Sequence, residues 1–220
     1  VLGMRLSDPG AYGRLIVDGL GDVERIVEYL DASPAERAVS LCNGGLMAFD
    51  SRRLPGLLDR IDCTNAKGEY YLTDTVALAR ADGHSVRYVE CSPDELIGIN
   101  SRADLAQVER IVQDRLRQAA MLDGATLIDP QSVYLSQDTK LGHDVVVHPF
   151  VVFGPGVEVG DGVEIRSFTH LEQTRISPGA VIGPYSRLRP GAEIGPGAHI
   201  GNFVEIKNSR IERGAKVNHL

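Results

Sequence analysis

Two basic residues near the end of the chain have a spacing that suits the binding of an anion. Arg189 and Lys207 are 18 residues apart, and each directly follows an aliphatic residue. If 18 residues complete one turn of a coil, the two cations lie on one face about 4.8 Å apart, where they repel each other unless an anion separates them. An arginine can hold a phosphate through two hydrogen bonds, so the pair is a candidate phosphate site. The alternative is two solvated cations with Glu205 as a neighbour.

Histidines in the same region are candidates for acid–base or metal chemistry. A neutral imidazole can act as a general base near pH 7, which makes His219 a candidate base. The repeat described below places His219 on a different face from Lys207, and the alternative is a polar residue without a catalytic role. His143 and His148 have a spacing that resembles a zinc site, but a catalytic zinc ion needs three protein ligands and the sequence offers no evident third.

Two asparagines lie in short turns that contain glycine. Asn43 stands before Gly44 and Gly45, and Asn100 closes a loop that begins at Gly98. Small residues let a ligand approach the backbone, and the side-chain carbonyl of an asparagine can bind a hard metal ion. Plain turns are the alternative at both positions.

The elements that must position these residues follow a six-residue period. From Leu135 onward an aliphatic residue recurs every six positions, with two steps shortened to five, which end at Ile176 and Ile211. Such a period predicts a parallel β-helix in which each hexad forms a short strand and a corner, and three hexads form one turn. The short steps predict one corner that is shortened twice. The side chains predicted to point inward are Leu135, Leu141, Val147, Phe153, Val159, Ile165, Leu171, Ile176, Ile182, Leu188, Ile194, Ile200, Ile206, Ile211 and Val217.

Residues 1–101 have the mixed pattern of an α/β domain. A segment Ser33-Pro34-Ala35-Glu36 predicts the start of a helix. A long amphipathic helix is predicted over 104–121, within a linker of residues 102–127 that precedes the β-helix at 128–220. Apolar patterns predict strands over 14–18, 23–29, 45–49 and 85–90, and helices over 51–61 and 71–81.

The composition excludes several classes of protein. The chain has 220 residues, is 43% hydrophobic and carries a net charge of -7, which gives it no general attraction to nucleic acid or to an anionic membrane. It contains no apolar stretch of the roughly 20 residues that a membrane span requires, and its start does not have the pattern of a signal peptide. Three widely spaced cysteines fit neither a disulfide framework nor a zinc cluster, so we expect a cytoplasmic protein.

Several segments along the whole chain resemble one enzyme family. The most specific are the run Asn65–Asp74 and the Leu188-Arg189-Pro190-Gly191 segment within the repeat. The full set is Ala11–Arg14, Ile26–Glu28, Cys42–Gly45, Asn65–Asp74, Gly98–Asn100, Arg187–Ala192, Gly201–Glu205 and His219-Leu220. In order and approximate spacing they are similar to the bifunctional bacterial N-acetylglucosamine-1-phosphate uridylyltransferase / glucosamine-1-phosphate N-acetyltransferase. The resemblance implies a partial nucleotidyltransferase domain of Rossmann-like α/β fold, followed by a left-handed parallel β-helix of hexapeptide repeats.

The resemblance also implies two activities in UDP-N-acetylglucosamine biosynthesis, which supplies peptidoglycan and lipopolysaccharide synthesis and so cell shape. The first transfers a uridylyl group from UTP with Mg²⁺, and the second transfers acetyl from acetyl-CoA to glucosamine 1-phosphate in a homotrimer. Carried onto this sequence, Gly13, Glu28, Asn43 and Asn100 contact the UDP-sugar, and Asn100 also binds the magnesium ion. Arg189 and Lys207 bind glucosamine 1-phosphate, and His219 takes a proton from the attacking amine.

The chain departs from the family pattern in ways that leave both sites incomplete. The glycine-rich triphosphate loop, the aspartate that also binds magnesium and the acetyl-CoA-binding turns have no counterpart here, so we expect the chain alone to be inactive. Leu30, Gly44 and Asn218 replace residues that are usual in the family. One alternative is a sugar-nucleotide pyrophosphorylase whose β-helix only oligomerises or regulates, and another is a scaffold without catalysis.

Overall fold

The computed structural model describes residues 1–219, which form two compact units, Val1–Leu105 and Ala106–Leu220. The division falls near the start of the long helix α4 (Arg102–Leu122). None of the helices in residues 1–219 combines the length and the apolar character needed to cross a bilayer. The predicted boundaries at 101/102 and 127/128 remain predictions.

The first unit is built on a five-stranded mixed sheet. Its strands are β1 (Leu2–Arg5), β2 (Arg14–Val17), β3 (Val23–Val27), β4 (Leu41–Asn43) and β5 (Val89–Glu90), in the order β3-β2-β4-β1-β5. The β2–β3 hairpin confirms the prediction from the sequence, whereas the strand predicted over 45–49 is wrong, because the strand is Leu41–Asn43 and Leu46 is exposed. Only β1 and β5 pair in parallel within residues 1–105. The unit therefore combines helices with a mostly antiparallel sheet, and its assignment as a Rossmann-like α/β domain remains a prediction.

Short helices complete the first unit. They are α1 (Pro34–Arg37), α2 (Leu54–Leu58), α3 (Asp74–Ala81) and the 3₁₀ helix η1 (Pro93–Glu95). At α1 the Ser33 hydroxyl accepts from the Glu36 backbone N–H, and the Glu36 carboxylate accepts from the Ser33 backbone N–H. This capping box confirms the helix start that the sequence predicts. The helices predicted over 51–61 and 71–81 form over shorter ranges than expected.

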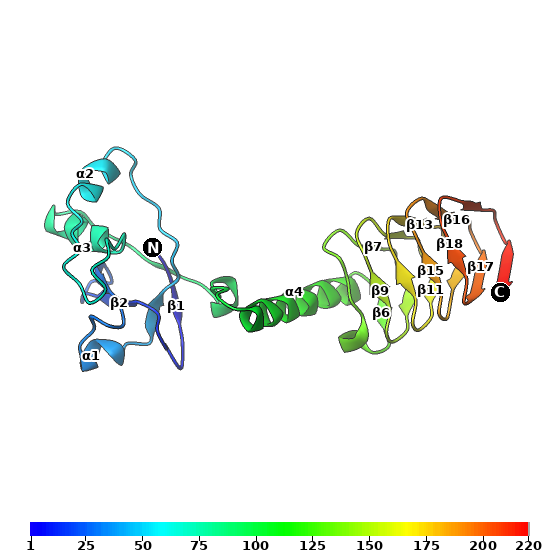
Figure 1. Cartoon of the computed structure of the whole chain (residues 1–220), viewed down its shortest axis with the longest axis horizontal. Helices are drawn as coiled ribbons and strands as arrows, with labels where there is room; N and C mark the ends of the chain where they lie inside the picture. The colour runs from blue at the N-terminus through cyan, green and yellow to red at the C-terminus, as the bar shows by residue number, and fades with distance from the viewer. Residues whose placement is uncertain (220) are drawn as a thin grey trace. The chain divides into compact units, whose positions relative to one another are not determined.

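The second unit is a left-handed parallel β-helix whose coils follow one another from β6 to β20 (Figure 1). A 3₁₀ helix, η2 (Pro130–Ser132), lies in the first coil. The first sheet contains β6 (Thr126–Leu127), β8 (Val146–Val147), β11 (Glu164–Ile165), β14 (Val181–Ile182), β17 (His199–Asn202) and β20 (Lys216–His219). The second sheet contains β9 (Val152–Phe153), β12 (His170–Leu171), β15 (Arg187–Leu188) and β18 (Glu205–Ile206). The third contains β7 (Lys140–Leu141), β10 (Glu158–Val159), β13 (Thr174–Ile176), β16 (Ala192–Ile194) and β19 (Arg210–Ile211).

The predicted inward register of the repeat is confirmed. Every predicted aliphatic marker packs in or against a single core, and Val159 and Ile194 keep only 5% and 1% of their surface exposed. Each marker lies on its equivalent one coil away, as Leu171 does on Leu188. In the first coil, Leu127 is the buried residue of β6, whereas Ile128 is exposed.

The three edges of the prism turn through residues with a left-handed backbone. At one edge these residues are Asp144 and four glycines, Gly162, Gly179, Gly197 and Gly214. The second edge contains Gln173 and Asn208, with φ of 42° and 44°, which confirms that both five-residue steps shorten one corner. The third, which we call the aromatic edge, is formed by Phe150, Phe168, Tyr185 and Phe203, with φ between 56° and 62°.

The outward side chains of the third sheet alternate in charge. We call this row, Lys140, Glu158, Arg175, Glu193 and Arg210, the charged face. Glu158 forms ion pairs on both sides, at 2.9 Å to Lys140 Nζ and 3.0 Å to Arg175 Nε. Opposite charges on neighbouring strands stabilise a sheet modestly, so this face of the prism suits contact with water.

Helix α4 packs polar side chains against the edge of the first coil, which would otherwise be open. The Gln113 Nε2 donates to the Leu135 carbonyl at 2.7 Å, and the Leu135 N–H donates to Gln113 Oε1 at 2.9 Å. Arg117 donates to the Val133 carbonyl at 3.1 Å, and both side chains are buried. The side-chain amide of Gln113 thus forms the two hydrogen bonds that the backbone of a neighbouring strand would form. Without it, backbone groups at this edge of the coil would be unpaired. The helix predicted over 104–121 is present, but two of its apolar residues, Leu105 and Val112, are exposed.

Candidate functional site

The second sheet brings Arg189 and Lys207 onto adjacent strands. Strands β15 and β18 pair in parallel, with Arg187 opposite Glu205 and Leu188 opposite Ile206. The Arg189 N–H donates to the Ile206 carbonyl at 2.8 Å, so the pairing continues to the two candidate cations. Their predicted juxtaposition one strand apart is therefore present. Whether they bind a phosphate is a separate matter and remains a prediction.

A carboxylate of the same chain lies beside this pair. Glu205 Oε1 is 2.8 Å from Arg189 Nη1, and Glu205 Oε2 is 3.6 Å from Arg187 Nη1. The hydrogen bond from Arg189 is the main cause that lowers the pKa of Glu205. Within residues 1–219 Lys207 forms no ion pair, but its charge is one of the lesser causes that lower the pKa of Glu205, so three cations share this one carboxylate. An incoming phosphate would pair with Lys207 and compete with Glu205 for Arg189.

His219 lies around a prism edge from the two cations. It belongs to β20 of the first sheet, where it is the register partner of Asn202 in β17. Lys207 follows β18 in the second sheet, and Phe203 of the aromatic edge turns the chain between β17 and β18. The prediction of different faces is confirmed. A site that uses all three residues must span this edge or draw on another copy of the chain.

His143 and His148 each have a protein partner. His143 Nδ1 is 3.1 Å from the carbonyl of Asp123, and His148 Nε2 is 3.1 Å from Glu164 Oε1. Glu164 also accepts a hydrogen bond from Arg166, which is the main cause that lowers the pKa of Glu164. Within residues 1–219, no three His, Cys, Asp or Glu side chains are grouped to hold a metal ion.

Three of the four residues predicted to contact the UDP-sugar lie together in the first unit. The Asn43 N–H donates to the Gly13 carbonyl at 2.8 Å, and a Cβ at Gly13 would lie 3.1 Å from Glu28 Oε1. The absence of a side chain at Gly13 thus leaves the Glu28 carboxylate accessible beside the backbone. Asn100 lies in the loop before α4, where its N–H donates to Asp104 Oδ2 at 3.0 Å. Asn100 supplies one oxygen donor and cannot hold a magnesium ion alone.

Two neighbouring side chains, Arg14 and Thr73, contact this group, although the sequence did not single them out. Arg14 is buried, and its guanidinium donates to the carbonyls of Tyr12, Gly10 and Arg37. These bonds fix the loop that carries Gly13. Thr73 Oγ1 donates to Glu28 at 3.4 Å.

The Tyr71 hydroxyl near this group is buried without a partner among the described residues. Burial, and then the neighbouring carboxylates of Asp31 and Glu69, raise the pKa of Tyr71. A polar atom in this position is available to a ligand that enters the group. The only signal in the sequence is the dense polar run Asn65–Asp74, for which a packed tyrosine pair is an equally simple explanation.

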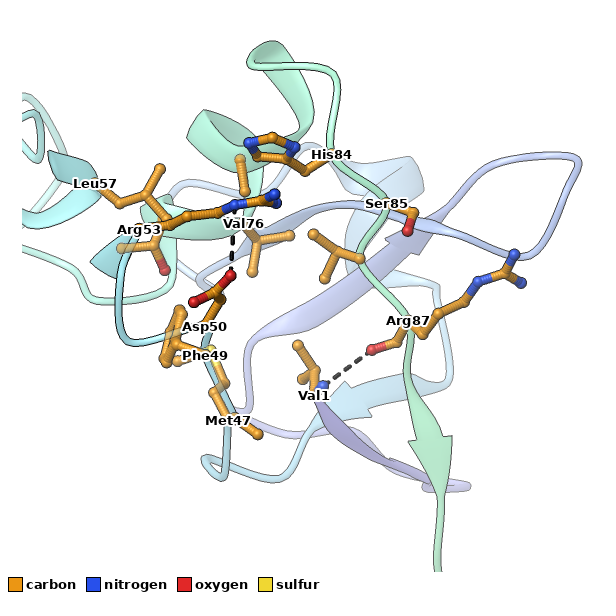
Figure 2. Close-up of a pocket in the computed structure, with 14 residues that line it drawn as sticks. Val1, Met47, Phe49, Asp50, Arg53, Leu57, Val76, His84, Ser85 and Arg87 are labelled. Atoms are coloured by element: carbon orange, nitrogen blue, oxygen red, sulfur yellow. Dashed lines mark hydrogen bonds and ion pairs between the residues drawn. The ribbon is translucent and has the colours of Figure 1, made fainter. Parts of the chain in front are cut away.

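A separate pocket of the first unit lies elsewhere (Figure 2). It is lined by Val1, Met47, Phe49, Arg53 and His84 among others, and by none of the four predicted UDP-sugar residues. Inside it Asp50 pairs with Arg53 at 3.6 Å, and the amino group of Val1 donates to the Arg87 carbonyl at 2.9 Å. Asp50, Arg53 and the Val1 amino group of this pocket thus already have protein partners, and we place the candidate site at Gly13, Glu28 and Asn43.

Comparison with known proteins covers both units. The family model described as bacterial transferase hexapeptide (six repeats) matches residues 138–173 and 173–208. A bifunctional protein GlmU from Paramagnetospirillum magneticum is 58% identical over 136 residues, which cover 62% of this chain and 30% of the relative. The GlmU of a Bradyrhizobium species is 54% identical over 176 residues, which cover 80% of this chain and 39% of the relative.

Among solved structures, a perosamine N-acetyltransferase from Caulobacter crescentus in complex with CoA and GDP-perosamine covers 64% of this chain and 80% of its own, at 16% identity and a TM-score of 0.32. A TM-score this low assigns neither fold nor ligand. The chain spans at most about two fifths of the length of the curated relatives named above. Over four fifths of this chain, the comparisons nevertheless confirm the resemblance found in the sequence: it is similar to part of the bifunctional GlmU proteins.

Proposed function

We propose that this chain is part of an enzyme of UDP-N-acetylglucosamine biosynthesis, and that its β-helix transfers acetyl from acetyl-CoA to glucosamine 1-phosphate. The observation that carries the proposal is the pair Arg189 and Lys207 on adjacent strands, which together with Arg187 share the single carboxylate of Glu205. The hexapeptide family model extends through these strands, and four fifths of the chain is similar to a GlmU protein. Together they support a site for a sugar that carries a phosphate.

The proposed reaction divides the work between binding and proton transfer. Arg189 and Lys207 hold the phosphate, whose charge is present throughout the reaction, so they contribute mainly to affinity. The amine nitrogen attacks the thioester carbonyl carbon, the carbon–sulfur bond breaks and the thiolate of CoA leaves. His219 accepts the proton that the amine loses, and the thiolate is protonated to the free thiol. General base catalysis of this kind contributes about 10²–10⁴-fold to the rate.

The first unit is proposed to contribute to uridylyl transfer from UTP to N-acetylglucosamine 1-phosphate. Gly13, Glu28 and Asn43, which lie together, would contact the UDP-sugar, and Asn100 would contribute an oxygen ligand to Mg²⁺. When bound, that ion would neutralise charge on the phosphates. Because the triphosphate loop and a second metal ligand have no counterpart here, we expect no uridylyl transfer by this chain alone.

The proposal includes a cytoplasmic homotrimer formed through the β-helix, and products that enter peptidoglycan and lipopolysaccharide synthesis and so affect cell shape. A sugar-nucleotide pyrophosphorylase with a non-catalytic β-helix remains the rival. The ion pair between Arg189 and Glu205 favours that rival, because a purely structural face would also pair its charges. The two proposals differ in whether the β-helix binds a phosphorylated amino sugar.

Titration calorimetry of this chain with glucosamine 1-phosphate and with unphosphorylated glucosamine tests the binding step. We expect glucosamine 1-phosphate to bind at least about tenfold more tightly, and Lys207→Ala to remove most of that difference. Arg210→Ala on the charged face is the matched control and should bind like the unaltered chain. Equal binding of the two sugars, or equal loss in both variants, would favour the pyrophosphorylase.

A further inference from the structure

Four charged side chains form a square on the outer face of the second sheet. Arg187 and Arg189 belong to the coil of β15, and Glu205 and Lys207 belong to the coil of β18. Arg187 is directly opposite Glu205 in the parallel pairing, and the same register continued by one bond places Arg189 opposite Lys207. Alternate residues of a strand share a face, so all four charges point outward together. A single carboxylate thus lies among three cations.

The carboxylate of Glu205 is shared unequally between the two arginines. Its short contact is diagonal, at 2.8 Å from Oε1 to Arg189 Nη1, whereas Oε2 is 3.6 Å from Nη1 of the directly opposite Arg187. The hydrogen bond from Arg189 is accordingly the first cause that lowers the pKa of Glu205, and the charge of Arg187 is a lesser one. Arg189 is also the less exposed arginine, with 32% of its side-chain surface exposed against 50% for Arg187. Glu205 therefore engages the arginine that the proposed function assigns to the phosphate.

A phosphate held between Arg189 and Lys207 would displace this contact. Phosphate and carboxylate oxygens carry charge of the same sign, so both cannot approach the Arg189 guanidinium closely without repelling each other. A Glu205 without another partner would remain beside the phosphate and weaken its binding. Arg187 offers that partner, because opposite charges directly across two strands attract each other. Since Oε2 is already 3.6 Å from Arg187, a rotation of the Glu205 side chain completes the exchange without movement of the backbone.

We propose that Arg187 is a positioning residue of the phosphate site, which takes the carboxylate of Glu205 from Arg189 when the phosphate binds. The inference rests on the proposed function and explains how the site accommodates a carboxylate of its own. Arg187 does not need to touch the phosphate, and its effect on affinity requires Glu205. The ion pair between Arg189 and Glu205 is then compatible with a binding site, because the pair has a second arrangement in which Glu205 keeps a cation.

A double-mutant cycle, measured by titration calorimetry of the whole chain with glucosamine 1-phosphate, tests this coupling. We expect Arg187→Ala to weaken binding about two- to fivefold, the range for the loss of one exposed ion pair. Arg187→Lys keeps a cation for Glu205 and should bind like the unaltered chain. Glu205→Gln removes the competing charge and should tighten binding. In the Glu205→Gln background, Arg187→Ala should have little further effect.

Glu172→Gln is the matched control for the loss of a negative charge. Glu172 lies on the same outer face, next to Arg189 on the side away from Lys207, since its N–H donates to the carbonyl of Leu188. The ion pairs of Arg189 within residues 1–219 involve Glu205 and not Glu172. Glu172→Gln should therefore tighten binding less than Glu205→Gln does.

Nuclear magnetic resonance of the arginine Nε–H groups follows the exchange without relying on affinity. Saturating glucosamine 1-phosphate should shift the Arg187 resonance in the unaltered chain and leave it nearly unchanged in Glu205→Gln. An unchanged Arg187 resonance in the unaltered chain would overturn the inference.

The outcomes separate this inference from the proposed function. An equal loss from Arg187→Ala in both backgrounds would show that Arg187 acts directly or through net charge, and equal tightening by Glu172→Gln and Glu205→Gln would show the same of Glu205. Either result would overturn the inference and leave the phosphate site in place, because Lys207→Ala tests that site separately. If the unaltered chain binds glucosamine 1-phosphate no more tightly than glucosamine, both proposals fail.

Discussion

The aromatic edge and the charged face are built on the same coils but face outward with opposite chemistry. Inside, both depend on one stack of aliphatic side chains. Outside, the charged face pairs its ions within the chain, whereas the aromatic edge leaves four rings exposed. The difference shows that a six-residue repeat constrains only its inward positions. The charged face thus carries paired ions, the aromatic edge carries exposed rings, and the second sheet carries Arg189 and Lys207.

The prediction with the largest expected effect tests whether the catalytic residues lie only on the side of the prism near the aromatic edge. In a form of the protein active in acetyl transfer, His219→Ala should lower kcat by about 10²–10⁴-fold with little change in KM, as for the loss of a general base. Lys216→Ala, on the same strand, is the control and should leave kcat unchanged. Steady-state kinetics measures both. A change in KM alone for His219→Ala would remove the base assignment.

A second test compares cations on the two sides of the prism. Arg189→Ala and Lys207→Ala should each weaken the binding of glucosamine 1-phosphate by about 1.5–3 kcal/mol, the range for a charge-assisted hydrogen bond. Lys140→Ala on the charged face carries the same change of charge and should have no such effect. Titration calorimetry at one ionic strength gives the three values. Equal losses at all three positions would mean that net charge, rather than a site, attracts the sugar phosphate.

A third test disrupts the first coil, on which edge and face both depend. Gln113→Ala leaves the N–H and carbonyl of Leu135 without partners, and each buried unpaired group costs about 1–3 kcal/mol. We expect the free energy of unfolding of the β-helix to fall by at least about that amount, measured by urea denaturation. Gln137→Ala changes an exposed glutamine and serves as the control. Equal stability of the two variants would show that the edge of the coil is accessible to water.

The prediction with the smallest expected effect concerns the pH dependence of stability, which should involve the charged face and not the aromatic edge. Ion pairs with Lys140 and Arg175 hold the pKa of Glu158 below its usual value of 4.5. A carboxyl whose pKa is lower in the folded state stabilises that state above its unfolded pKa, and the contribution is lost as pH falls through the folded value. Glu158→Gln should therefore reduce the slope of stability against pH below 4.5, and only slightly because the pair is exposed. Self-association at a fixed pH should be the same in both proteins.

Much of the β-helix was predictable because its period is strict. The inward residues follow from the spacing alone, and the two five-residue steps at Gln173 and Asn208 identify one corner. The aromatic edge was missed although Phe150, Phe168, Tyr185 and Phe203 recur once in every coil. Aromatic residues are not among the residues usually found in turns. The contribution of Gln113 and Arg117 was missed because an amphipathic pattern counts apolar residues and overlooks buried polar ones.

The first unit was less predictable because its strands are short and pair over long separations. β1 pairs with both β4 and β5, which lie about 40 and 90 residues further along the chain. The predicted strand over 45–49 failed because Gly45 has a φ of 79° and ends the strand. For the candidate sites, spacing predicted that Arg189 and Lys207 lie side by side, while the roles of Gly13, Glu28, Asn43, Asn100 and His219 came only from resemblance.

The side-chain amide of Gln113 provides a starting point for the folding of the β-helix. Each coil pairs only with the coil before and after it. The domain can therefore fold one coil at a time, and forming the first coil is the step that costs the most free energy. By supplying the peptide-like partner for Leu135, α4 provides a surface on which that coil can form from local contacts. Order should then spread from α4 toward β20. If so, Gln113→Ala should slow folding more than it speeds unfolding, whereas changes in the last coils should mainly affect the unfolding rate.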